Sequence, residues 1–359
     1  MSRLRAISLY SGAGGLDFGF IQAGFEVAWA NEIDPWACKT YEENIGPHVV
    51  CGDVLETSPP TGLTADIVIG GPPCQGFSVI GRMRPRDPRS RHVFHFLDVV
   101  EAVGANGFVM ENVKALGASP RWATVRRQLI ERAEDLGFTV GLFLLNAADF
   151  EVPQNRERMF LVGLRGATPC PPQPVSANCP ITVRQALGEL PSFGDPGNDG
   201  IVPARITPAA NPVMRPSPFR GSLLFNGSGR PLHLDSPAKT IPASMGGNAT
   251  PIIDQDELEH GAEPWVAVYH RRLLAGGRPL KRVPTRLRRI TLEEAAALQS
   301  FPGSWTFRGP RVAQMRQVGN AVPPKLALHV AGAVHHAMSE RIEGDRTATA
   351  PLANLPVPA

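Results

Sequence analysis

A short apolar segment that runs directly into a glycine-rich turn restricts the fold of this chain most strongly. Residues 4–10 alternate in the manner of a buried strand, and Ser11-Gly12-Ala13-Gly14-Gly15 follows and opens a helix. This order is typical of doubly wound α/β folds, in which the turn holds a nucleotide. Asp17 stands where the dinucleotide fingerprint has its third glycine, which argues against a pyrophosphate ligand.

Two acidic residues follow the next two predicted strands. Residues 25–30 form an apolar run that ends at Asn31-Glu32, and Glu32 lies about twenty residues beyond the first glycine, where a carboxylate can bind ribose hydroxyls. Asp53 follows the short strand 49–51 and could bind an adenine edge. Together these features predict a nucleoside cofactor without a pyrophosphate, and S-adenosylmethionine is the commonest candidate.

A cysteine follows the fourth predicted strand. The β-branched run 65–69 ends in Gly70-Gly71-Pro72-Pro73, so the chain turns sharply and then presents Cys74 at the carboxyl end of a buried strand. A thiol held there is a candidate nucleophile if nearby groups lower its pKa. A buried structural cysteine is the alternative, and this stretch alone does not decide between the two.

The residues after Cys74 are rich in arginine and proline. Five arginines fall within residues 81–92, a composition that excludes a helix. The segment is either a solvated loop or a lid that closes on a polyanion, and its position beside Cys74 favours the lid.

A later strand supplies a carboxyl group, and a polar segment supplies three donors. Residues 107–113 contain Glu111, which we expect near Cys74 at the same sheet edge, with a raised pKa that suits a proton donor. Residues 138–146 and 159–164 are predicted to be adjacent strands around Gln154, Arg156 and Arg158. The alternation places these three donors on one side of a strand, where they could hold an oxygen of a substrate base and orient Glu111. Surface ion pairs are the alternative for the arginines.

Composition bounds the class of protein and its organisation. The chain has 359 residues, 43% hydrophobic, with a net charge of +3, which fits roughly two soluble domains. Five scattered cysteines argue against a disulfide framework or a zinc site. The absence of a signal peptide and of a membrane-length apolar run predicts a soluble, cytoplasmic protein.

The later part of the chain predicts a second domain and a final pair of helices. Proline, glycine and serine from 167 to 200 mark a boundary, and the densest basic region, 271–289, indicates a loop-rich domain that lies on nucleic acid. Thr291 and Glu294 form a capping box for a helix over 290–299. The last helix is expected to end near Met338, and residues 341–359 are expected to be disordered.

Taken in order, these motifs resemble those of the DNA (cytosine-5) methyltransferases of the bacterial restriction-modification type. The resemblance covers residues 7–163 and 289 to about 330 and is carried by Ser11-Gly12-Ala13-Gly14-Gly15, Pro72-Pro73-Cys74-Gln75, Glu111-Asn112-Val113, Gln154-x-Arg156-x-Arg158 and Gln317-x-Gly319-Asn320. It implies an α/β doubly wound, Rossmann-like S-adenosylmethionine-dependent catalytic domain over 1–170 and 289–340. It also implies a small, loop-rich target-recognition domain over 171–288.

The resemblance also implies a role for individual residues. The catalytic set is Cys74, Glu111, Arg156 and Arg158. The set expected at S-adenosylmethionine, and at its product S-adenosylhomocysteine, is Tyr10, Ser11, Gly12, Gly14, Gly15, Leu16, Glu32, Ile33, Asp53, Val54, Pro73 and Asn320. The set expected to contact DNA is Gln75, Ser78, Arg82, Arg84, Arg89, Gln154 and Lys239. No metal is expected.

The expected partner is double-stranded DNA, bound by a monomer in the bacterial cytoplasm near the nucleoid, and a cognate restriction endonuclease is possible. Two alternatives stay open. A tRNA cytosine-5 methyltransferase shares the core motifs but has little recognition domain, whereas this chain spends more than a hundred residues there. A catalytically silent nucleic-acid-binding homologue would not need Cys74, Glu111 and Arg158.

Overall fold

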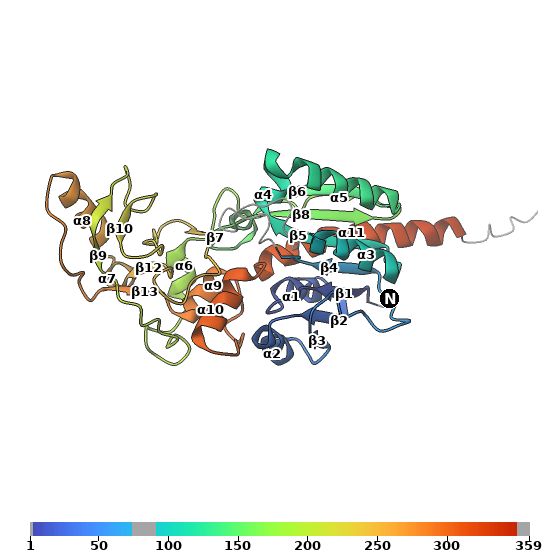
Figure 1. The fold of residues 1–359 in the computed structure, drawn as a ribbon, viewed down its shortest axis with the longest axis horizontal. Helices are drawn as coiled ribbons and strands as arrows, with labels where there is room; N and C mark the ends of the chain where they lie inside the picture. Colours follow the sequence, from blue (N-terminus) through green and yellow to red (C-terminus); the bar gives the residue numbers. More distant parts are fainter. Residues whose placement is uncertain (1–2, 74–90, 350–359) are drawn as a thin grey trace, which may run out of the picture.

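A mixed seven-stranded sheet forms the centre of the N-terminal part of the protein (Figure 1). The computed structural model describes residues 3–73 and 91–349, with side chains as far as Arg341. The strands run in the order β3-β2-β1-β4-β5-β8-β6. β1 to β5 are parallel, whereas β8 is antiparallel to both β5 and β6. The strands are β1 (Arg5–Leu9), β2 (Glu26–Glu32), β3 (Val49–Cys51), β4 (Ile67–Gly70), β5 (Gly107–Val113), β6 (Thr139–Asn146) and β8 (Glu157–Leu164).

Helices cover both faces of this sheet, as the continuous apolar strands require. Ala6 and Ile7 are both fully buried although they point to opposite faces. One face packs on α1 (Gly15–Gln22), α2 (Pro35–Asn44) and α11 (Pro324–Thr349). The other packs on α3 (His92–Val103), α4 (Lys114–Ala118) and α5 (Ala123–Asp135). Two 3-10 turns, η2 (Pro120–Trp122) and η3 (Ala147–Phe150), join these elements. The fold is therefore the doubly wound α/β arrangement that the sequence predicts.

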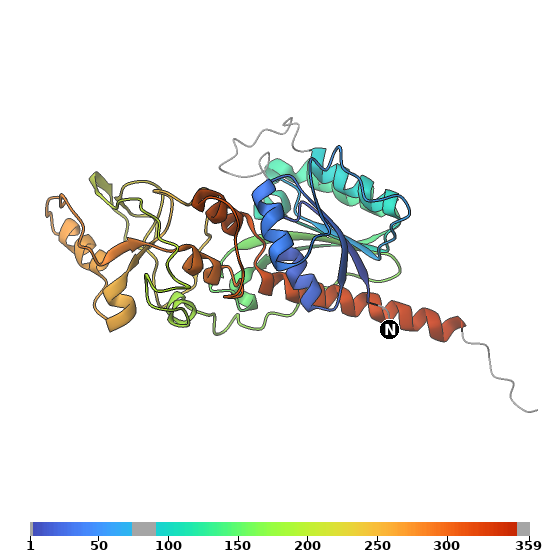
Figure 2. The same cartoon turned by 90° about the horizontal axis from the view of Figure 1, so that it is seen from below.

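Helix α11 comes from the far end of the described chain and packs directly on α1 (Figure 2). A Cβ on Gly19 would lie 2.4 Å from the Cβ of Ala327 and 2.5 Å from the backbone N of Leu328, so the two helices approach as closely as glycine allows. This packing completes the face of the sheet that carries the glycine-rich turn.

Residues 171–288, the predicted target-recognition domain, which we call the recognition region, and the helices after them form a second, more irregular part of the molecule (Figure 1). Its strands pair in twos: β10 with β9, β11 with β7, and β12 with β13. Two further apolar clusters hold it together, one around α6, α9 and α10 and one around α8. Its elements, with β7 preceding it, are β7 (Gln154–Asn155), α6 (Val183–Gly188), β9 (Pro208–Val213), β10 (Leu223–Phe225), β11 (Ala238–Lys239), β12 (Ile252–Asp254), α7 (Gln255–His260), α8 (Trp265–Leu274), β13 (Leu287–Arg289), α9 (Leu292–Leu298) and α10 (Arg311–Asn320).

The local predictions agree with the structure in most places. The capping box of α9 is present, because Thr291 Oγ1 accepts from the N–H of Glu294 while the Glu294 carboxylate accepts from the N–H of Thr291. The end of the chain differs: α11 continues past Met338 to Thr349, so residues 341–349 are helical rather than part of a disordered tail. Residues 350–359 lie outside the described residues. No helix in the described ranges is long and apolar enough to span a membrane.

Asp17, in the first turn of α1, is fully buried and points into the core. Ser8 Oγ donates to its Oδ1 at 2.7 Å. Burial raises the pKa of Asp17 to about 6, and the hydrogen bond from Ser8 opposes that rise. The carboxyl is therefore neutral in the folded protein at a pH where it is ionised in the unfolded chain.

We predict that Asp17→Asn stabilises the protein above pH 6 but not near pH 4. The contribution of the buried neutral carboxyl is complete below the unfolded pKa and is lost as pH rises through about 6. At pH 8 this loss amounts to about 3 kcal/mol. Thermal unfolding midpoints at pH 4.5 and 8 measure the effect, with the exposed Asp98→Asn as control. A difference between variant and wild type that stays constant with pH would contradict the prediction.

Candidate active site

Most of the predicted cofactor residues in the described ranges lie where the parallel strands end. The strand order reverses between β1 and β4, and such a switch point is where α/β sheets bind ligands. Gly70, the last residue of β4, pairs with Leu9 of β1, and a Cβ on Gly70 would lie 2.2 Å from the Leu9 carbonyl oxygen. The glycine thus lets the two strands end side by side.

Glu111 and Arg158 form an ion pair between neighbouring strands. The antiparallel register of β5 and β8 sets Glu111 opposite Phe160 and Val113 opposite Arg158, so Glu111 and Arg158 are diagonal neighbours. Arg158 Nε lies 2.9 Å from Glu111 Oε1, and the two side chains are only 14% and 13% exposed. Burial raises the pKa of Glu111, and the charge of Arg158 opposes the rise. A buried carboxyl beside a cation can hold a proton and exchange it with a substrate.

Asn112 fixes the loop that leads to Cys74. Its side chain is buried, and its Nδ2 donates to the Pro72 carbonyl at 3.1 Å. A Cβ on Gly71 would lie 3.1 Å from Glu111 Oε2, so this loop also lies against the Glu111 carboxyl. The sequence motif contains Asn112, but its role as the anchor of the loop needs the structure. Cys74, Gln75, Ser78, Arg82, Arg84 and Arg89 lie outside the described residues.

Gly12 and Glu32 are joined at the end of β1. The N–H groups of Gly12 and Asp34 donate to the two Glu32 carboxylate oxygens, each at 2.8 Å. Burial raises the pKa of Glu32, and these two hydrogen bonds oppose the rise. Gly12 has φ +56°, and no atom lies within 4 Å of the position of a Cβ there, so the turn faces open space. Ile33 is 65% exposed next to it.

These features fit an adenosine group that lacks a pyrophosphate. The open space at Gly12 adjoins a carboxylate and an exposed apolar side chain, which suit ribose and adenine. The first turn of α1 holds the buried Asp17, whose carboxyl disfavours a phosphate at that helix end. The residues present therefore fit S-adenosylmethionine better than a dinucleotide.

Asp53, Val54 and Tyr10 lie around the same edge. Asp53 Oδ1 accepts from the N–H of Leu55 at 3.0 Å, which fixes the turn after β3. Val54 is 4% exposed and packs in the apolar cluster under β1, so little of its side chain remains for a ligand. Tyr10 adopts φ +56°, and its hydroxyl lies 3.1 Å from His92 Nδ1 at the start of α3.

The remaining predicted cofactor residues shape the turn and its surroundings. Ser11 donates through Oγ to the Asn31 carbonyl, and Gly14 has φ +86° at the start of α1. A Cβ on Gly15 would lie 2.4 Å from the Val322 carbonyl, which brings the segment after Asn320 against the turn. Leu16 is buried in the core, whereas Asn320 is exposed and Pro73 half-buried.

Gln154 does not join Arg158 beside Glu111, so the expected row of three donors is wrong for Gln154. Arg156 stays near Glu111, because its charge, like that of Arg158, opposes the rise of the Glu111 pKa. Gln154 belongs to β7, which pairs with β11 rather than with β5. Its fully buried amide donates to the Leu298 carbonyl at 3.1 Å and accepts from the N–H of Ile241 at 3.0 Å. The expectation that Gln154 contacts DNA is therefore corrected, because its side chain lies inside the protein. Arg156 is 1% exposed. It donates to the backbone carbonyl of Ile241 in the recognition region and to those of Gly319 and Asn320 at the end of α10.

Comparison with known proteins decides the family. The model of the C-5 cytosine-specific DNA methylases matches residues 4–192 and 244–336. The chain belongs to this family. The gap in the match, 193–243, falls inside the recognition region.

Relatives and solved structures agree with this assignment. Type II methyltransferase M1.HphI of Haemophilus parahaemolyticus is 36% identical over 342 residues, 92% of this chain and 86% of that protein. Type II methyltransferase M.NgoFVII of Neisseria gonorrhoeae is 31% identical over 94% of this chain and 88% of its own length.

Two solved structures share the fold. A putative DNA modification methyltransferase from an Escherichia coli prophage has a TM-score of 0.66 at 22% identity, covering 94% of this chain and 99% of that one. The S. pombe Dnmt2 methyltransferase has a TM-score of 0.61 at 18% identity, covering 96% of this chain and 99% of its own. The predicted fold class and the predicted enzyme class, a DNA cytosine-5 methyltransferase, are thereby confirmed.

Lys239 lies in a group of positive charges in the recognition region of this methyltransferase. The pKa of Lys239 is lowered, first by the partial burial of its side chain and then by the charges of Arg230 and Arg220. Lys239 and Arg220 are exposed. In the described part of the chain no carboxylate pairs with these three side chains. We call Arg220, Arg230 and Lys239 the basic cluster.

Much of the densest basic region, in contrast, is used inside the protein. Arg286 Nε lies 2.6 Å from Asp254 Oδ1, and Arg288 pairs with the buried Glu294 while its guanidinium stacks on Phe193. Arg289 is 3% exposed and donates to the Thr250 carbonyl at 2.7 Å. The expectation that this whole region lies on nucleic acid is corrected for these arginines.

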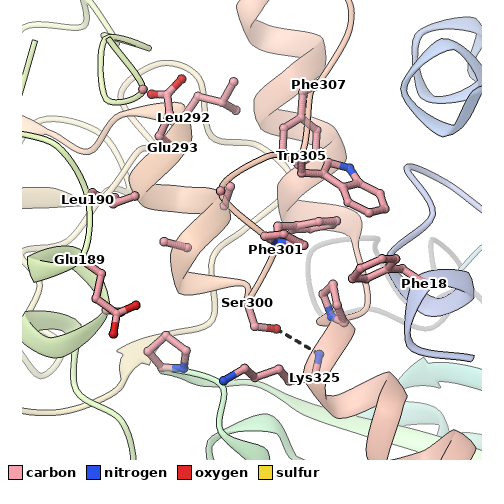
Figure 3. Close-up of a pocket in the computed structure, with 18 of the residues that line it drawn as sticks. Phe18, Glu189, Leu190, Leu292, Glu293, Ser300, Phe301, Trp305, Phe307 and Lys325 are labelled. Atoms are coloured by element: carbon pink, nitrogen blue, oxygen red, sulfur yellow. Dashed lines mark hydrogen bonds between the residues drawn. The ribbon is translucent and has the colours of Figure 1, made fainter. Parts of the chain in front are cut away.

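A separate cavity of about 780 Å³ lies between α1, α6, α9 and the start of α11 (Figure 3). Phe18, Phe301 and Trp305 line it, and nearby Ser300 Oγ accepts from the backbone N–H of Lys325 at 3.2 Å. Among the described residues that line it, none belongs to the predicted catalytic or cofactor set. It is thus distinct from the site at the strand ends. Nor do the described ranges contain a cluster of three His, Cys, Asp or Glu side chains arranged for a metal.

Proposed function

We propose that this protein transfers a methyl group from S-adenosylmethionine to C5 of cytosine within a short specific sequence of duplex DNA. The observation that carries the proposal is the buried Glu111–Arg158 pair, set against the loop that leads to Cys74. The relatives are type II methyltransferases by name, which supports a role in protecting DNA from a restriction endonuclease. Family membership supports S-adenosylmethionine as the methyl donor.

The cofactor half of the site is formed by Gly12, Glu32 and Asp53. The Glu32 carboxylate would hold the ribose hydroxyls, Asp53 and Ile33 the adenine, and the exposed Asn320 the methionine end. When bound, the cofactor supplies a sulfonium methyl, an electrophile that needs an electron-rich carbon. These residues would hold it at the end of β1, where no atom of the described residues lies within 4 Å of the position of a Cβ on Gly12.

C5 of cytosine is a poor nucleophile, so the protein must first activate the ring. The Cys74 thiolate adds to C6 and forms an S–C6 bond, and the electrons of the C5–C6 double bond then become available at C5. Negative charge develops toward N3 and O2 as the adduct forms. Glu111 gives its proton to N3, and Arg158, 2.9 Å from Glu111, stabilises the O2 side.

Once C5 carries the methyl group, a base removes the C5 proton and the Cys74 thiolate leaves, which restores the C5–C6 double bond, and N3 returns its proton to Glu111. Since C6 is attacked from the face of the ring, the cytosine must be turned out of the duplex. Arg156 holds the segments around this pocket in place through backbone carbonyls, and we assign it a positioning role.

The basic cluster would bind the DNA backbone next to this pocket. Lys239 pairs in register with Asn155 of β7, on the segment that leads to Arg158. Three cations gathered without a carboxylate partner favour an anion, and DNA phosphates match that charge.

We predict that Glu111→Gln lowers kcat about 100-fold or more while the affinity for DNA stays within about twofold, because glutamine cannot deliver a proton to N3. Single-turnover methyl transfer and DNA-binding titration measure the two quantities. Glu157→Gln is the matched control, since Glu157 is exposed and pairs only with Lys114 among the described residues. An unchanged rate would remove Glu111 from the mechanism.

Bisulfite sequencing of plasmid DNA from cells that express the chain tests the activity itself. We expect cytosines at one short motif to resist conversion, and we expect Cys74→Ala to abolish that resistance while still binding S-adenosylmethionine. Protection that persists in Cys74→Ala would mean a different nucleophile. If no cytosine is protected, labelled cofactor with tRNA as substrate tests the tRNA alternative.

We predict that Lys239→Gln weakens DNA binding at every sequence and reduces the slope of log affinity against log salt by about 1. The affinity for S-adenosylmethionine should not change. Arg127→Gln, which removes an exposed cation of α5 already paired with Glu131, is the matched control. Equal salt slopes for wild type and Lys239→Gln would exclude the basic cluster from the DNA interface.

A further inference from the structure

Two cysteines that are separated in the sequence meet beneath Glu32. Cys38 Sγ donates to the Glu32 carbonyl oxygen at 3.3 Å. The same carbonyl accepts from the N–H of Gly52 at 2.9 Å, so the sulfur lies close to the Cys51–Gly52 peptide. The register of β2 and β3 also pairs Glu32 with Cys51. Burial first, and then the neighbouring Cys51 side chain, raise the pKa of Cys38, which agrees with two thiols that lie close together.

The two thiols differ in their access to solvent. Cys38 is 3% exposed in α2, whereas Cys51 is exposed at the carboxyl end of β3. Neither takes part in the proposed methyl transfer. A core packing role explains Cys38 but leaves the exposed Cys51 unexplained. An exposed thiol next to a buried one has the arrangement of an oxidisable thiol and its resolving partner.

We propose that Cys38 and Cys51 form a reversible disulfide on exposure to a hydroperoxide, and that this disulfide weakens cofactor binding. The second half rests on the proposed function of Glu32 and Asp53. In a reducing cytosol such a bond is transient, as regulatory disulfides are.

The chemistry is a two-electron oxidation in two steps. The Cys51 thiolate attacks the terminal oxygen of the hydroperoxide, the O–O bond breaks, and the alkoxide or hydroxide leaves and takes up a proton. The resulting Cys51 sulfenic acid is then attacked by the Cys38 sulfur. The S–S bond forms, the S–O bond breaks, and the hydroxyl leaves as water with the Cys38 proton. A dithiol reductant reverses the sequence.

The bond would act on the cofactor site through the end of β3. Forming it removes the thiol hydrogen bond to the Glu32 carbonyl and shortens the sulfur separation to about 2 Å. Cys51 leads directly into Gly52-Asp53, and Glu32 carries the carboxylate of the same pocket. Drawing β3 toward α2 therefore shifts Asp53 relative to Glu32, which changes the spacing that adenosine must span.

The test uses the full-length protein with Cys74, Cys170 and Cys179 replaced by serine, so that only Cys38 and Cys51 can react. Hydrogen peroxide is the oxidant, and peptide mapping without reduction detects the linked pair. Calorimetry with S-adenosylmethionine measures Kd before oxidation, after it, and after dithiothreitol. We expect a Cys38–Cys51 peptide, a loss of affinity of about fivefold or more, and full recovery on reduction. Cys51→Ser in the same background should show none of these changes.

Each contrary result would overturn a different part of the proposal. No linked peptide at peroxide levels that oxidise Cys170 in the wild-type protein would overturn the disulfide. A linked peptide with an unchanged Kd would overturn its effect on the cofactor. A reduced protein that fails to bind S-adenosylmethionine would contradict the proposed function, while the peptide map would still decide the thiol pair.

Discussion

The Arg156 guanidinium lies almost wholly inside the protein, where it donates to the backbone carbonyls of Ile241 and Gly319 at 3.2 and 3.0 Å. A buried cation is stable only where acceptors replace the water that it has lost. Here those acceptors come from the recognition region and from the end of α10, while Arg156 itself stands between β7 and β8. One planar group with several donors, a geometry that lysine cannot supply, therefore joins the recognition region and the Asn320 segment to the chain that leads to Arg158.

The catalytic edge is organised by one strand. β5 carries Glu111, which meets Arg158 on the next strand, and Asn112, which holds the Pro72 carbonyl of the loop before Cys74. Consecutive residues of a strand point to opposite faces. One short motif thus positions the Glu111 carboxyl with one side chain and the loop before Cys74 with the next. β2 has a similar role on the side proposed for the cofactor. There the Glu32 carboxylate accepts a hydrogen bond from the N–H of Gly12, and the Glu32 carbonyl accepts one from the N–H of Gly52.

The sequence was sufficient for the strands and their carboxyl ends. Each depends on a local apolar pattern, and the rule that parallel strands end at one edge brings their last residues together. The sequence also predicted that donors after residue 153 could orient Glu111, but the pair with Arg158 follows from the antiparallel register of β5 and β8. It failed where a side chain's direction depends on packing between distant segments. Gln154 turns inward because β7 pairs with β11. Arg288 and Arg289 find partners in Glu294 and Thr250, which no local pattern indicates. The proximity of the Cys38 and Cys51 thiols could not be predicted for the same reason, because it depends on the packing of α2 against β3.

The packing of α11 on α1 has a consequence for how the protein is made. Gly19 of α1 fits against Ala327 of α11, and Thr40 bonds to Gln317 across 277 positions of sequence at 2.6 Å. Domains emerge from the ribosome from the N-terminus and fold as their contacts become available. The glycine-rich turn is translated first, yet the helix that covers its face is translated after the whole recognition region. The face that carries the glycine-rich turn therefore reaches its final packing only after residues 171–288 have been translated, so a nascent chain that ends before α11 has this face uncovered.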